Sequence, residues 1–470
     1  MINYIFVCLI VFIYFFRSLY GGYSVDDNWF ENNLKWFRDG GHKDTKLKDK
    51  LHIIFFAAGY FKTAFKDHLF TMSLFMLLSC LVYKVSGSML ATIFYILCPV
   101  NNQIAIWMNG RRYLVSAICA LASMVFPPMF FMLYPFAVWL HVSSVPLPLM
   151  MALKGHWVYL IIGIAFFFLF GYKRIKERFI SRKSEFSEGN EIQALKPRKV
   201  IILIKRLGFY FFHTILPNKP RMFHEHQYYY GRYEAENKRA YSLDFDFWKG
   251  AVVVLYVSWE IIFNQNFWAF WWLAFILPWC GIAQVTMNVA DRYCSLAGVG
   301  LISLFTQRIS LLPSPFAESI IVGVLVFYVV RYEPLFRAYS SIDNFYWYHI
   351  AIQPDGVEAR ICLSKKYLEK RDPFSAFALV KEGLRYRPRD FKLLLQQATV
   401  MFAMGHREQG VKILEISKKY VPLGEEKIAE DEIDKIIKDE RIAAKITPDK
   451  IIYVPQNRQQ RRFLERKNKQ

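Results

Sequence analysis

Two adjacent aspartates, Asp26 and Asp27, follow the first apolar segment of the chain. Neighbouring carboxylates close to a membrane surface can act as a general base, hold a divalent metal ion, or do both. The same pair would also suit a solvated loop in which one aspartate caps a helix. The pair is our candidate for catalysis, and Mg²⁺ or Mn²⁺ is an optional cofactor beside it.

Cations near the ends of apolar segments are the second candidate group. Arg111 and Arg112 lie in the polar turn 98–113, and Arg292 follows Asp291 at the start of another apolar segment. A guanidinium fork matches the geometry of a phosphate, so these residues could bind an anionic ligand. Two alternatives need no bound ligand. The arginines could reach lipid headgroups, or Asp291 and Arg292 could form an internal salt bridge.

The segment 215–234 combines cations, histidines and three consecutive tyrosines. His224 and His226 bring no third ligand at a spacing typical of a metal site, so we do not expect a metal ion there. Aromatic and basic side chains together suit an interfacial loop that grips a lipid phosphate or a sugar.

The elements that must position these residues are membrane helices. The chain has 470 residues, of which 54% are hydrophobic and 18% aromatic, and the apolar residues form blocks close to the length of about 20 that crosses a bilayer. A compact cytosolic enzyme, a collagen and a disordered tail protein all fit poorly. We expect an all-α polytopic bundle with eleven spans near 2–16, 67–85, 88–105, 111–127, 129–152, 155–171, 199–217, 248–264, 267–284, 293–307 and 315–331.

Charge sets the expected orientation. The net charge is +21, and the segment 172–199 carries nine Lys and Arg against four Glu. Short basic loops stay in the cytoplasm, so this segment is expected inside, with the loops 18–66 and 218–247 and everything after 332 outside. Because many basic residues stand between apolar blocks, we expect contact with the lipid bilayer and no nucleic-acid partner.

After Arg331 the sequence becomes that of a soluble helical region. Pro354, Pro388 and Pro422 are 34 residues apart, which is the period of a tetratricopeptide repeat. We expect paired helices at 357–370 with 373–386 and at 390–403 with 406–420, with the small Ala376 and Ala378 at a close contact. Flanking helices at 341–352 and 425–447 would cap two such repeats within 332–424, followed by a charged tail over 425–470. An unrelated helical bundle is the alternative.

In order, these motifs resemble the transmembrane-and-tetratricopeptide-repeat family of GT-C glycosyltransferases, which includes the TMTC-type O-mannosyltransferases. The resemblance covers roughly residues 1–420. It runs through Asp26-Asp27, Asp67-His68-Leu69-Phe70, Cys98-Pro99-Val100 with Trp107 and Gly110-Arg111, Leu207-Gly208-Phe209-Tyr210, and Ala290-Asp291-Arg292-Tyr293.

The resemblance implies an integral membrane enzyme that transfers a hexose, such as mannose, from a polyprenyl-phosphate carrier to a protein or glycan acceptor on the non-cytoplasmic face. It implies a carboxylate of the first outer loop as the base and nearby cations on the donor phosphate. The membrane would be a bacterial inner membrane or the endoplasmic reticulum. The donor-phosphate candidates are Arg111, Arg112, Arg292, Lys219 and Arg221, and the sugar or acceptor candidates are His68, Gln103, Trp107, His224, Tyr229 and Asp291.

Three positions depart from the family pattern. Asn101 and Gln103 stand where the family has His and Glu, and Tyr113 stands where it has Asp. Two of these changes remove carboxylates, which favours an inactive membrane scaffold that presents its repeats to a protein partner as the alternative function. A lipid-linked-sugar transporter would need paired half-chain repeats with interrupted spans at matching positions, which we do not find.

Overall fold

The computed structural model describes residues 1–21, 60–61, 63–107, 110–166, 168, 197–218, 220, 242–280, 290–421, 429–431 and 433–438. All regular secondary structure within these ranges is helical, in agreement with the expected all-α class.

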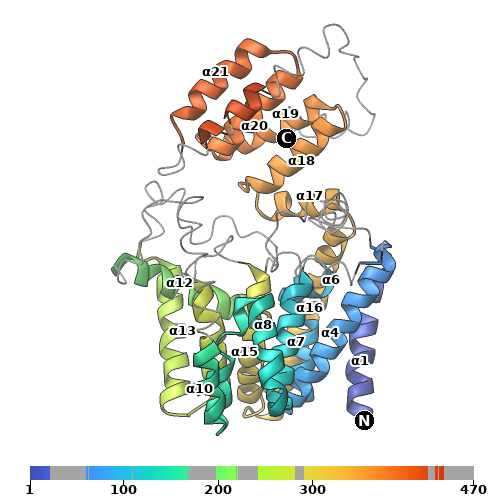
Figure 1. The fold of residues 1–470 in the computed structure, drawn as a ribbon, viewed down its shortest axis with the longest axis vertical. Coiled ribbons are helices and arrows are strands. Elements are labelled where there is room, and N and C mark those ends of the chain that lie inside the picture. The colour runs from blue at the N-terminus through green and yellow to red at the C-terminus, as the bar shows by residue number, and fades with distance from the viewer. Residues whose placement is uncertain are drawn as a thin grey trace.

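The helices form a bundle and, at one end of it, a smaller C-terminal group (Figure 1). The bundle contains α1 (Ile2–Phe15), η1 (Phe16–Tyr20), α4 (Ala64–Ser86), α5 (Met89–Leu97), η3 (Pro99–Asn101), α6 (Asn102–Ile106), α7 (Arg111–Val125), η5 (Pro127–Met129), α8 (Phe130–Leu140), η6 (Val142–Ser144), α9 (Leu147–Leu153), α10 (Trp157–Phe166), α12 (Pro197–Ile215), α13 (Phe245–Ile262), α14 (Phe267–Ile276), η9 (Leu277–Cys280), η10 (Asp291–Tyr293), α15 (Cys294–Ile309) and α16 (Ser314–Tyr339). The C-terminal group contains α17 (Ile342–Ile352), α18 (Glu358–Glu369), α19 (Pro373–Tyr386), α20 (Phe391–Ala403) and α21 (Arg407–Lys418).

Among the described residues, three helical segments are long and apolar enough to cross a membrane, namely Ile2–Tyr20, Ala64–Ser86 and Ser314–Tyr339. They coincide with three of the eleven expected spans. A fourth candidate, Met89–Leu97 with Pro99–Ile106, is bent by 58°. This bend interrupts the expected span 88–105, because Pro99 has no backbone N–H with which to continue the helix. Shorter apolar helices lie at Pro127–Leu140, Trp157–Phe166 and Phe267–Cys280.

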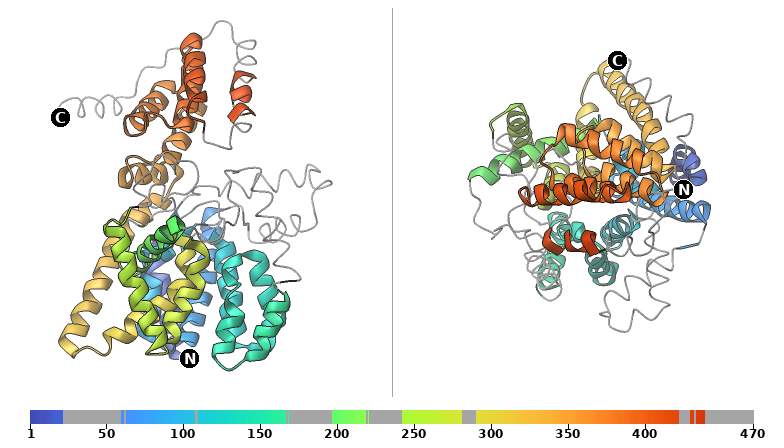
Figure 2. Two further views of the ribbon diagram at one scale, coloured as in Figure 1. Left: turned by 90° about the vertical axis from the view of Figure 1, so that its left-hand side faces the viewer. Right: turned by 90° about the horizontal axis from the view of Figure 1, so that it is seen from above.

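Helix α12 does not form the upright span expected over 199–217. It lies across one end of the bundle (Figure 2). Lys205 forms an ion pair of 2.9 Å with Asp244, which caps the first turn of α13. Lys205 is in the middle of α12, and near the C-terminal end of the helix His213 contacts Asp291 just before α15. Because the middle and the C-terminal end of α12 both lie beside the starts of helices at the same end of the bundle, α12 crosses that end and does not traverse the bundle.

The helices between α8 and α12 differ from the spans expected over 129–171. The expected span 129–152 is two helices, α8 and α9, and α10 follows a turn at Lys154. Tyr159, near the start of α10, packs on Phe130, the first residue of α8. The other end of α8 is at His141, so the start of α10 is remote from α12. Helix α10 therefore runs toward the end of the bundle that carries α12. Most of 172–199 lies outside the described residues, so the expected separation of this segment from the repeats stays a prediction.

The C-terminal group has the helices that its sequence predicts. The pairs α18–α19 and α20–α21 match the expected ranges to within two residues at each end, and α17 matches the flanking helix at 341–352. Asp372 and Asp390 cap the starts of α19 and α20. Ala376 is buried as expected, whereas Ala378 is exposed because it lies on the opposite side of the same helix. Only part of the expected helix 425–447 is described, and there Ala429 and Ile433 pack against α20 and α21.

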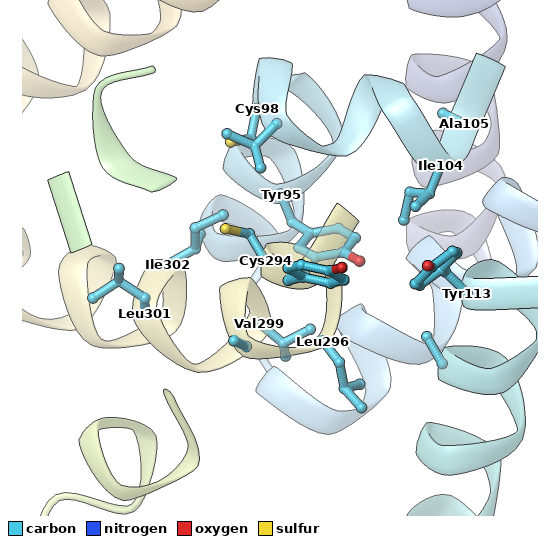
Figure 3. Close-up of a cluster of buried hydrophobic side chains, with 14 of the residues drawn as sticks. Tyr95, Cys98, Ile104, Ala105, Tyr113, Cys294, Leu296, Val299, Leu301 and Ile302 are labelled. Carbon is cyan, nitrogen blue, oxygen red and sulfur yellow. The ribbon is translucent and has the colours of Figure 1, made fainter. Parts of the chain in front are cut away.

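One hydrophobic core joins the bundle to the C-terminal helices. It extends from Val7 in α1 to Phe345 in α17 and Leu363 in α18. Figure 3 shows a central part of this core, where Tyr95, Cys294 and Tyr113 converge from α5, α15 and α7. The shared core holds the C-terminal group against the end of the bundle that α12 crosses, which we call the polar end.

Candidate functional site

The polar end collects the described candidate residues from distant parts of the sequence. Asp67 and His68 are in the first turns of α4, and Gln103 and Trp107 are in and just after α6. Arg111 and Arg112 begin α7, and Asp291 and Arg292 form η10. The remaining candidates lie outside the described residues, namely Asp26, Asp27, Lys219, Arg221, His224 and Tyr229.

Arg111 is held by a carboxylate of the chain itself. Its Nη2 lies 3.2 Å from Asp67 Oδ1 and donates to the Asp67 carbonyl at 2.6 Å, while Nε donates to Thr71 Oγ1 at 2.7 Å. Both side chains are almost fully buried, with 3% exposure for Arg111 and 0% for Asp67. A buried ion pair satisfied in this way joins α4 to α7. In the described part of the chain Arg111 therefore takes part in a buried ion pair, and its expected contact with phosphate stays a prediction.

Arg292 is equally buried, but no carboxylate among the described residues forms an ion pair with it. Its Nε donates to the hydroxyl of Tyr113 at 3.0 Å, and its guanidinium carbon lies 5.1 Å from the centre of the Tyr293 ring. Its Nη1 is buried without any hydrogen-bond partner. The alternative of an internal salt bridge with Asp291 is wrong, because Asp291 pairs with His213 at 2.9 Å.

Arg112 directly precedes Tyr113 in the sequence, and its side chain also contacts the Tyr113 ring. Its guanidinium carbon is 5.1 Å from the Tyr113 ring centre, and that of Arg292 is 5.6 Å from it. Arg112 Nε is also buried and unpartnered. Two guanidinium groups thus share one phenol ring, and neither of them forms an ion pair with a described carboxylate.

Gln103 positions the backbone of Arg292. Its Oε1 accepts a hydrogen bond from the backbone N–H of Arg292 at 2.9 Å, whereas its Nε2 has no partner. Trp107 lies 5.9 Å from the Arg292 guanidinium carbon. Both residues were expected to contact sugar or acceptor, and both lie beside the unpaired cation. His68 is buried at the start of α4.

A column of aromatic rings lines the same place. The Tyr113 and His141 ring centres are 4.0 Å apart, His141 stacks on Trp279 at 5.2 Å, and Trp279 stacks on Tyr293 at 4.4 Å. Sequence reasoning missed His141, His213 and Trp279. The two histidines are single polar residues within apolar stretches, and Trp279 follows several other aromatic residues, so only the tertiary contacts reveal these three.

No group of three or more His, Cys, Asp or Glu side chains that could hold a metal ion is present among the described residues. The candidate metal ligands Asp26 and Asp27 lie outside them. The described site is therefore a cationic and aromatic one.

Comparisons with protein-family models, with curated proteins and with solved structures find no match to this chain.

Proposed function

We propose that the polar end binds the phosphate of a polyprenyl-phosphate-linked sugar and that the protein transfers this sugar to a protein or glycan acceptor. The observation that carries the proposal is the buried guanidinium of Arg292. Leaving a buried charge unpaired costs several kcal/mol. An anionic ligand would remove this cost, and it would complete the hydrogen bonding of Nη1.

The chemistry of sugar transfer fits such a site. The leaving group is an anionic phosphate, and fixed cations in a site shielded from water stabilise the negative charge that develops on it. The aromatic column formed by Tyr113, His141, Trp279 and Tyr293 offers apolar ring faces to a sugar. The acceptor base would be Asp26 or Asp27, and the C-terminal helices, as tetratricopeptide repeats, would lie beside the acceptor.

The proposal includes a multi-pass membrane domain. Helix α13 is too charged to count as a span by composition, yet it exposes a stripe of apolar side chains on one side. Trp248 is 60% exposed, Val252 63%, Leu255 70% and Trp259 55%. A stripe of this kind on a bundle helix suits contact with lipid tails. We propose that α13 and the shorter apolar helices cross the membrane together with the three long ones.

The orientation in the membrane rests on the family resemblance. The basic segment 172–199 was the marker of the cytoplasmic side, and its flanking helices lead to the same end as the site. The non-cytoplasmic location of the site is therefore a proposal that labelling must test.

The direct test is equilibrium binding of radiolabelled farnesyl-phosphate mannose to the purified protein in lipid nanodiscs. Arg292→Gln should weaken binding by about 30-fold or more, because truncating a buried charge partner costs about 2–5 kcal/mol. Arg337→Gln is the matched control, since Arg337 is an exposed cation of α16 with 74% side-chain exposure. Absent binding by the wild type, or equal binding by Arg292→Gln, would refute the proposal.

A second candidate is a scaffold without catalytic activity. Gln103 and Tyr113 stand at the two positions where the resembled family has carboxylates. Both form hydrogen bonds with Arg292. The double substitution Asp26→Asn and Asp27→Asn separates the two functions. Loss of sugar transfer supports the enzyme, whereas unchanged cellular function supports the scaffold.

A further inference from the structure

The charged side chains around Tyr113 indicate which kind of phosphate group the site binds, a point that the proposed function leaves open. Two guanidinium groups and the His141 ring contact this ring, and further basic side chains lie at the polar end. Arg111 is paired with Asp67, and His213 is paired with Asp291. Arg112 and Arg292 have no such partner, and each has a buried nitrogen without a hydrogen bond. Among the described residues, no carboxylate forms an ion pair with either of these two guanidinium groups, which lie against the same Tyr113 ring.

Tyr113 contacts both of these guanidinium groups. Its hydroxyl accepts a hydrogen bond from Arg292 Nε, and its ring contacts both guanidinium groups. The contact with Arg292 is a hydrogen bond to a hydroxyl group and not an ion pair with a carboxylate. An aspartate at this position would pair with an arginine and occupy the place of an anionic ligand.

We infer that the site takes a diphosphate diester, which carries two negative charges, in preference to a monophosphate diester, which carries one. Each guanidinium would then face one phosphate group. This inference rests on the proposed function and concerns the donor that the same site binds. The diphosphate could belong to a lipid-linked sugar or to a nucleotide sugar, because the charged group is the same in both.

The experiment compares three probes that differ in charge and in the group attached to the phosphate. Farnesyl methyl phosphate carries one negative charge, farnesyl methyl diphosphate carries two, and uridine diphosphate glucose carries two on a nucleotide. Binding is measured by calorimetry on the full-length protein in nanodiscs at low salt. The variants are Arg112→Gln, Tyr113→Phe, Tyr113→Asp and the control Arg337→Gln, each checked for its thermal unfolding midpoint.

The wild type should bind the diphosphate lipid at least about tenfold more tightly than the monophosphate lipid, because one more unit charge beside a guanidinium in a partly buried site exceeds one tenfold step. Arg112→Gln should remove this preference while the monophosphate lipid still binds. Tyr113→Phe keeps the ring and should keep the preference, whereas Tyr113→Asp should abolish it.

The remaining outcomes separate the two proposals. Equal binding of the two lipids, or a preference for the monophosphate, overturns the diphosphate inference and leaves the proposed function intact. Binding of the nucleotide sugar alone supports the diphosphate and refutes the lipid carrier. If none of the probes binds, both the proposed function and this inference are wrong. A preference that survives in Arg112→Gln also overturns the inference, even if Tyr113→Asp fails to fold.

Discussion

At the scale of single residues, two buried arginines of the polar end have opposite surroundings. Arg111 has a carboxylate from its own chain, whereas Arg292 has a phenol and two other aromatic rings nearby. The difference separates a cation that joins two helices through an ion pair from one that we propose receives a ligand. It gives the two residues different expected phenotypes, namely loss of stability for Arg111 and loss of anion binding for Arg292.

Asp67→Asn should destabilise the protein by about 3–5 kcal/mol, because it leaves the Arg111 charge buried without its partner. The thermal unfolding midpoint in detergent measures this. Ser73→Ala on the same helix is the control, since Ser73 is exposed and should change stability by less than about 0.5 kcal/mol. The double substitution Asp67→Asn with Arg111→Gln should recover part of the loss. An Asp67→Asn variant as stable as the wild type would show that the ion pair does not hold α4 to α7.

At the scale of elements, the crossing of α12 over α13 depends on two glycines. A Cβ on Gly208 would lie 2.6 Å from Gly250 Cα, and a Cβ on Gly250 would lie 2.2 Å from the Ile204 carbonyl oxygen. Both contacts are with backbone, which cannot rotate away as a side chain can. The close approach places His213 beside Asp291 and therefore fixes one wall of the site.

Gly250→Ala should destabilise the protein by about 1–3 kcal/mol, because the added methyl group overpacks the crossing. Gly323→Ala is the matched control on α16, where no atom lies within 4 Å of an added Cβ. That control should be neutral or slightly stabilising, since alanine favours a helix. The two unfolding midpoints provide the comparison, and equal effects would argue against the close crossing.

The junction between α17 and α18 should respond to acid. Burial alone would raise the pKa of the Asp343 carboxyl, but hydrogen bonds from Lys366 and Lys370 outweigh it and lower the pKa. A carboxyl whose pKa is lower in the folded state stabilises the fold above its unfolded pKa of about 3.9, and this contribution is lost as the pH falls.

Hydrogen exchange of the α17 and α18 amides, corrected for the intrinsic rate, should therefore rise faster in the wild type than in Asp343→Asn between pH 5 and 3. The effect should stay below about 1 kcal/mol, because the carboxyl is partly exposed. Identical pH profiles for the two proteins would contradict this role of Asp343.

At the scale of the whole molecule, the polar end gathers the site, α12 and the C-terminal helices on one side of the bundle (Figure 1). The opposite end has short turns, such as Gly87 after α4 and Gly155 between α9 and α10. The two ends should therefore meet different compartments.

Single cysteines at Lys183 and Lys418 should react with a membrane-impermeant reagent from the same side in intact vesicles, while a cysteine at Gly155 should react from the other. The background is a variant without native cysteines that retains the wild-type unfolding profile. If position 183 is labelled together with position 155, α12 crosses the membrane and the arrangement at the polar end is wrong. The side on which 183 and 418 react also tests the proposed non-cytoplasmic location.

The sequence by itself determined the class of fold and most helix positions. Apolar blocks long enough to cross a membrane, and prolines 34 residues apart, are local signals that do not depend on distant contacts. For this reason α4, α16 and the pairs α18–α19 and α20–α21 lie where the sequence predicts them. Helix α12 has a similar apolar content but a different direction, because direction is set by what it packs against.

Only the tertiary structure decided which partner each of these cations has. In the sequence, Arg111, Arg112 and Arg292 are equivalent basic residues near helix ends. In the folded chain, Asp67 forms an ion pair with Arg111, His213 contacts Asp291, and Tyr113 accepts a hydrogen bond from Arg292. These partners are separated by tens to hundreds of residues along the chain. Whether a buried charge is compensated depends on contacts at a few ångströms, which local sequence patterns do not encode.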